Sequence, residues 1–165
     1  MTTPNYMMLN EFRIEKSLLP VSLRLMDGQV LNGDVFVQAS ARHRFEQEDA
    51  IEVMNNPSVF FPLRLSNGTT VLISKIQVRE VHVAADHSAP PDWSVGVPTP
   101  VRIQLLDGAE VEGKLCVDPM PRSARALDYL NRATDRFLPV YRTDGLVLVA
   151  LSQVVLVRQL VDAAT

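Results

Sequence analysis

One sequence element occurs twice in this chain of 165 residues. Residues 25–35 read LMDGQVLNGDV and residues 105–115 read LLDGAEVEGKL, so an Asp-Gly pair and a later glycine recur in the same register. In each copy, apolar and polar residues alternate before the Asp-Gly pair. This pattern predicts a β-hairpin with a type I′ turn, which needs a positive φ at both central residues. The chain is therefore expected to fold as two related β units.

The similarity between the two copies continues beyond the hairpin. Gly33 and Gly113 lie inside the second strand of each hairpin, and a glycine there favours a bulge or a sharp bend. Two later pairs of segments also match, residues 60–68 with 137–145 and residues 71–81 with 147–157. Five short strands with local connections in each copy predict two small barrels.

An insertion with helical spacing follows each hairpin. Ile51 and Met54 recur at helical spacing in the first copy, and Leu127 and Leu130 do so in the second. The predicted division is an N-terminal segment 1–18, a first barrel 19–84, a Pro-rich linker 85–99 and a second barrel 100–165. The linker holds Trp93, which is expected to pack the linker onto a neighbouring surface rather than to act as a binding anchor.

Composition and motifs exclude several classes of protein. The net charge of −3 does not suggest the basic patch of a protein that binds a polyanion. The apolar run 146–161 is shorter than the ~20 residues that a membrane-spanning helix needs. The chain has neither a signal-peptide pattern nor a second cysteine for a disulfide, so a cytoplasmic location is expected. No phosphate loop, nucleophile elbow or zinc-ligand spacing occurs, and we expect no enzyme activity, metal or cofactor.

The repeated motif resembles that of the Sm-like family of small β-barrels. The matching residues are DGQVLNG at 27–33 and DGAEVEG at 107–113. Apolar residues stand at the intervals of the family's second motif, at Ile73, Val78 and Val81 in the first copy and at Val149, Val154 and Val157 in the second. The resemblance implies a mainly β fold of two tandem five-stranded Sm-like (SH3-like) barrels, each with a short helical insertion after the first hairpin.

The resemblance also implies candidate ligand-binding residues. RNA-binding members of the family use an Asp-x-x-Met-Asn loop and an Arg-Gly turn. Asn55 and Asn131 stand near the loop position in this chain, and Lys75 stands at the turn of the first copy, although neither copy has an Arg-Gly pair. Asn55, Lys75 and Asn131 are therefore the residues that would contact a nucleobase.

The two insertions differ in charge. Acidic residues predominate in the first insertion, whereas the second is basic through Arg122, Arg125, Arg132 and Arg136. Two solvated helix faces would explain these charges, and complementary docking within or between chains is the alternative.

We interpret the chain as a non-catalytic protein-interaction or scaffold module, with an RNA-binding Sm-like protein as the alternative. Residues 76–83 are expected to pair with a strand of the second barrel. Residues 154–161 would then remain as an apolar outer edge, which invites pairing. A homodimer through this C-terminal strand is predicted, with burial of the edge by the N-terminal segment at residues 6–16 as the alternative. A protein partner that the sequence does not identify is also expected, and no membrane.

Overall fold

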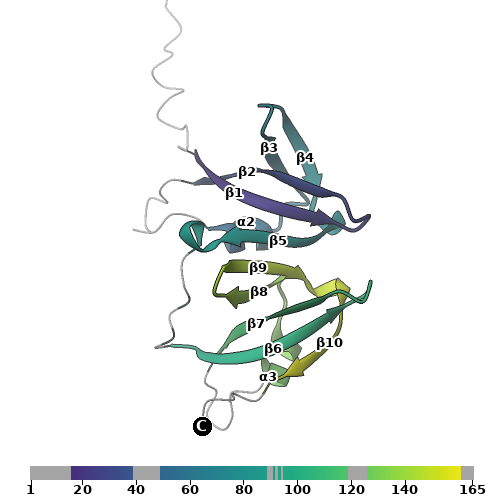
Figure 1. The fold of residues 1–165 in the computed structure, drawn as a ribbon. Coiled ribbons are helices and arrows are strands. Elements are labelled where there is room, and N and C mark those ends of the chain that lie inside the picture. Colours follow the sequence, from purple (N-terminus) through teal and green to yellow (C-terminus); the bar gives the residue numbers. More distant parts are fainter. Residues whose placement is uncertain are drawn as a thin grey trace, which may run out of the picture.

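The computed structural model describes residues 16–38, 49–88, 91, 93, 95–118 and 126–160. The fold is mainly β, with one antiparallel ten-stranded sheet and two short helices (Figure 1). The strands of the first copy are β1 (Lys16–Leu25), β2 (Val30–Gln38), β3 (Phe60–Leu65), β4 (Thr70–Ser74) and β5 (Val78–Ala84). Those of the second copy are β6 (Val97–Leu105), β7 (Glu110–Val117), β8 (Phe137–Arg142), β9 (Gly145–Ala150) and β10 (Val154–Gln159). Helices α2 (Ala50–Asn55) and α3 (Ala126–Arg132) follow the first hairpin of each copy.

The order of strands in the sheet is β10-β6-β7-β8-β9-β5-β1-β2-β3-β4. Each copy thus contributes five consecutive strands with the same internal order, and the copies join where β5 pairs with β9. The expected pairing of residues 76–83 with a strand of the second copy is confirmed. In Figure 1, β5 and β9 lie side by side between the two halves of the molecule.

The expectation of two closed barrels is not confirmed, because the sheet is open and ends at β4 and β10. In the first copy, β5 is already paired on both sides, with β1 and with β9. It therefore has no free edge with which to close the first copy. Strand β1 begins at Lys16 and β6 at Val97, so both strands start before the boundaries predicted from the sequence.

Both Asp-Gly hairpins form where they were predicted, but the turn type was wrong. Gly28 has a φ of 89°, and no described residue other than glycine has a positive φ. Gly28 N–H donates to the carbonyl of Leu25 at 3.0 Å, and Leu25 N–H donates to that of Gln29 at 2.9 Å, as in a longer turn that ends in a glycine bulge. The Asp27 carboxylate accepts from Gln29 N–H at 2.9 Å, so this aspartate supports the turn with its side chain.

The glycines inside β2 and β7 serve close approach rather than a bulge. Strand β2 pairs with β1 through Gly33 without a register shift, whereas the shifts lie at Arg24/Leu25 and at Val154/Leu156. A Cβ added at Gly33 would lie 2.5 Å from the carbonyl oxygen of Arg64, and one at Gly113 would lie 2.6 Å from Val140 Cγ1. Only glycine lets the next strand approach so closely.

We expect Gly33→Ala to destabilise the protein by ~1–3 kcal/mol, because the backbone of β3 must move away from the added methyl group. Gly28→Ala is the comparison. It adds a methyl group with no atom within 4 Å, so only the positive φ opposes it, at a cost of roughly 1 kcal/mol. Urea unfolding measures both values. An equal loss of free energy in the two variants would contradict the close-approach argument.

Candidate functional site

The strongest functional feature is the junction between the two copies. Strands β5 and β9 pair from Glu80↔Val149 to Ala84↔Gly145. Alternate side chains of β9 then point into different cores. The first core takes in four buried residues of the second copy, Phe137, Leu146, Leu148 and Ala150. Buried residues of the second core come from the second copy alone. The second copy therefore completes the core of the first, and no described residue returns that contribution.

Asn55 ties the first helix to the second copy. Its side-chain Nδ2 donates to the carbonyl oxygen of Phe137 at 3.1 Å, and Phe137 N–H donates to its Oδ1 at 2.9 Å. The amide thus satisfies both backbone groups at the buried start of β8, as a neighbouring strand would. The position that the family resemblance assigns to a nucleobase is occupied here by the chain's own backbone.

Lys75 is buried in the first copy, where its ammonium group caps the end of α2. Nζ donates to the carbonyl oxygens of Val53 at 2.8 Å and Asn56 at 3.0 Å, and to Asn56 Oδ1 at 2.7 Å. Burial, followed by the charge of Arg136, lowers the pKa of Lys75 below its ordinary value. A lysine has three donors, and these contacts use all of them.

A charged cluster that the sequence did not reveal also crosses the junction. Arg79 on β5 is buried, and its guanidinium binds Asp107 in the β6–β7 turn and Glu80 at 3.1 Å. The sequence around Arg79 gives no indication of this contact, because Asp107 lies in the other copy. Burial would raise the pKa of Glu80, but hydrogen bonds and charges of His82 and Arg79 outweigh burial and lower it.

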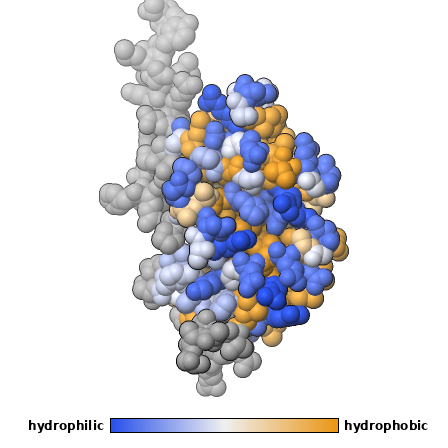
Figure 2. Space-filling view, viewed as in Figure 1, coloured by the Kyte–Doolittle hydropathy of each residue, from blue (hydrophilic) through white to orange (hydrophobic). Residues whose placement is uncertain are grey.

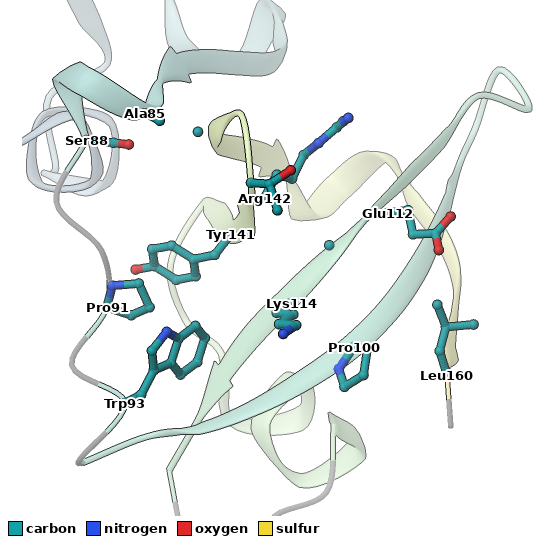
Figure 3. A pocket seen from close by; sticks show the side chains of 13 residues that line it. Ala85, Ser88, Pro91, Trp93, Pro100, Glu112, Lys114, Tyr141, Arg142 and Leu160 are labelled. Atoms are coloured by element: carbon teal, nitrogen blue, oxygen red, sulfur yellow. The ribbon is translucent and has the colours of Figure 1, made fainter. Parts of the chain in front are cut away.

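Trp93 lies at an open groove of about 810 Å³ beside the second copy (Figure 3). Its ring meets that of Tyr141 edge-on, with centroids 5.9 Å apart, and it remains partly exposed. Lys114 and Arg142 also line the groove, but Arg142 forms an ion pair with Asp144 at 3.2 Å. Burial raises the pKa of Tyr141 to about 12.

The remaining predicted residues do not gather into one site. Asn131 and Arg132 are exposed on α3, where Arg132 Nε donates to the carbonyl oxygen of Asp128 at 3.1 Å. Arg136 is exposed just before β8, and its charge reaches Lys75. Arg122 and Arg125 lie outside the described residues, as does most of the acidic insertion. Docking of the two insertions stays a prediction.

The two outer edges, β4 and β10, expose apolar side chains. Figure 2 shows hydrophobic residues at the upper end of the molecule, where β3 and β4 lie. Exposed apolar residues at or beside these edges are Val59, Phe60 and Leu72 in the first copy and Val155 and Leu156 in the second. Such residues on an unpaired strand favour contact with another chain.

Within the described ranges, no three potential metal ligands come together, and no helix is long and apolar enough to span a bilayer. No protein-family model, curated protein or solved structure matches the chain. The candidate sites are the junction, the outer edges and the groove beside Trp93.

We expect Asn55→Ala to lower the free energy of unfolding by ~1–3 kcal/mol, because it leaves the N–H and C=O of buried Phe137 without a partner. Asn131→Ala is the matched control in the other copy. Its side chain is exposed, so the isolated chain should change by less than ~0.5 kcal/mol. Denaturant unfolding at low protein concentration measures both. Similar losses would contradict the role of Asn55 at the junction.

A second prediction concerns acid. Backbone N–H of Ala109, with Arg79, lowers the pKa of Asp107, and the pKa of Glu80 is lowered as well. The native state thus binds fewer protons than the unfolded state around the ordinary carboxyl pKa values. Stability should fall as the pH drops below these values and through the lowered ones.

In Arg79→Met the carboxyl groups lose this partner, so the loss of stability in acid should be smaller than in the wild type. Unfolding free energies measured from pH 7 to pH 3 give the two slopes. Parallel slopes would show that Arg79 does not hold these pKa values down.

Proposed function

We propose that the chain is a non-catalytic scaffold, built from two Sm-like barrels, that binds other protein through its outer strand edges. The observation that carries this proposal is the junction, where a strand edge and a core of one copy are completed by the other. The same surfaces recur, uncovered by any described residue, at β4 and β10. Addition of a strand to an open edge is a common mode of protein recognition.

The contacts of the residues assigned by resemblance argue against a nucleobase pocket. Asn55 is bound to the backbone of Phe137, and the donors of Lys75 are used by α2. Binding to RNA relies on phosphate contacts from clustered basic side chains, and the net charge is −3. A scaffold needs neither feature. The cytoplasmic location stays a prediction.

One observation favours RNA binding as the second candidate. The groove beside Trp93 combines two aromatic rings with Lys114 and Arg142, and unpaired bases stack on such rings. Glu112 also lines the groove, and Arg142 is paired with Asp144, which leaves little positive charge for phosphates. We therefore rank this candidate below the scaffold.

The deciding experiment is capture by the immobilised full chain from a lysate of its own cell, with and without nuclease. We expect captured protein to remain bound after nuclease treatment. It should no longer be captured by a variant that carries both Leu72→Asp, on the β4 edge, and Leu156→Asp, on the β10 edge. Trp93→Ala should retain it. Material that disappears with nuclease, or with Trp93→Ala alone, would contradict the scaffold and support the RNA candidate.

A further inference from the structure

We propose that the scaffold assembles head to tail with other molecules of the same protein. In this assembly, β10 of one chain pairs antiparallel with β4 of the next chain. This inference rests on the proposed scaffold function and names its partner as a second copy of the same chain. Its template is the junction within the chain, because β10 is the counterpart of β5 and β4 is the counterpart of β9. The outer edges are thus the two halves of a contact that the chain already makes once.

Burial shows what the outer edges lack. Phe137 and Leu148, which complete the first core, are 0% exposed. Their counterparts in the first copy, Phe60 and Leu72, are 55% and 71% exposed. In a head-to-tail assembly, Phe60 and Leu72 of one chain would enter the second core of the neighbouring chain. That core receives no such contribution from the described part of its own chain.

The backbone donors fit the same arrangement. Leu160 N–H donates to Pro100 O at 2.9 Å, toward β6, and N–H groups alternate in direction along a strand. Those of Val157 and Gln159 therefore point outward. Directly after β4, Lys75 N–H donates to Val59 O at 2.9 Å, toward β3, so the N–H of Leu72 points outward by the same alternation.

The register follows from the junction by equivalence. Val81 pairs with Leu148 and Val83 with Leu146 across β5 and β9. At the outer contact, the corresponding pairs are Val157 with Leu72 of the next chain and Gln159 with Thr70 of the next chain. Both predicted pairs join residues whose N–H groups point outward, as hydrogen-bonded pairs of an antiparallel ladder require.

Asn131 supplies an independent element of the same contact. It is the counterpart of Asn55, and it is exposed on α3. Phe60, the counterpart of Phe137, starts β3 as Phe137 starts β8. The Asn131 amide of one chain would therefore bind the N–H and C=O of Phe60 of the next chain.

The outer contact differs from the junction in two respects. Gln159 and Thr70 stand where Val83 and Leu146 pair at the junction. Val155 and Leu156 occupy the positions of Arg79 and Glu80, so the ion pair with Asp107 has no counterpart. Assembly would then depend on apolar burial and backbone hydrogen bonds, and added salt should weaken it little. A contact between unlike surfaces makes a ring if the rotation closes and a filament if it does not.

The test uses the full chain and two single variants that block opposite edges. Leu72→Asp places a charge on the β4 edge, and Gln159→Pro removes an outward donor from β10. Light scattering should give species larger than the 18.4 kDa monomer for the wild type and monomers for each variant alone. An equimolar mixture should give a dimer and nothing larger, because each variant retains the edge that the other lacks.

Three further variants complete the test: a control, a substitute for the proline variant and a weakened contact. Leu106→Asp changes a leucine of the same 71% exposure in the β6–β7 turn and should leave assembly intact. Leu156→Asp replaces Gln159→Pro if the proline disturbs folding, which circular dichroism would reveal. Asn131→Ala should weaken assembly about tenfold, as expected for the loss of hydrogen bonds to backbone.

Three results would overturn the proposal. A wild type that stays monomeric at high concentration would mean that the edges do not bind a second chain. A dimer that persists in Leu72→Asp would mean that two β10 strands pair with each other. A mixture of the two variants that contains only monomers would rule out the head-to-tail contact. Each result leaves the nuclease-resistant capture of another protein unaffected, so the scaffold function would be judged separately.

Discussion

The rest of the structure depends on the pairing of β5 with β9. It joins ten strands into one sheet, and it places β9 between two hydrophobic cores. Side chains of β9 that face one way bury themselves among the first copy, and those that face the other way belong to the second. Because Phe137 and Leu148 of the second copy are buried in the first core, the two copies share that core.

The junction combines three interactions of different character. The ladder between β5 and β9 is general to any strand edge, whereas the contact of Asn55 with Phe137 fixes one register of helix and strand. The contact of buried Arg79 with the half-exposed Asp107 adds a charge pair between the copies. A slip of one residue would break the Asn55 contact and turn the alternating side chains of β9 to the wrong cores.

Much of the fold was predictable because its signals are local. The Asp-Gly hairpins, the helical spacing around Ile51 and Leu127, and the duplication itself can all be recognised within short windows. The exact turn was not, since Asp27 acts through its side chain where the dipeptide alone suggests a positive φ. The role of Gly33 depends on the carbonyl of Arg64 on a neighbouring strand, which a window around the glycine does not contain.

The candidate site was less predictable because its contacts join distant segments. Asn55 and Lys75 were selected by resemblance to a pocket, yet their partners are Phe137 and helix α2. Nothing near Arg79 in the sequence indicates Asp107 as its partner. The pairing of residues 76–83 with the second copy could be anticipated, because a duplicated strand edge has an obvious complement in the other copy.

The divergence of the copies is consistent with one fixed junction and one adjustable contact. At the junction, buried Arg79 is paired with Asp107 of the second copy, and a buried charge is costly to separate from its partner, which favours permanent association. Val155 and Leu156, at the positions of Arg79 and Glu80 on β10, carry no such requirement and can be exposed when no partner is present. The edge β4 is only five residues long, and exposed Gln159 and Arg158 add polar side chains to β10. Short and partly polar edges limit indiscriminate pairing. The physical demand on a partner is therefore specific: it must supply a strand of matching register together with large apolar side chains for an incomplete core.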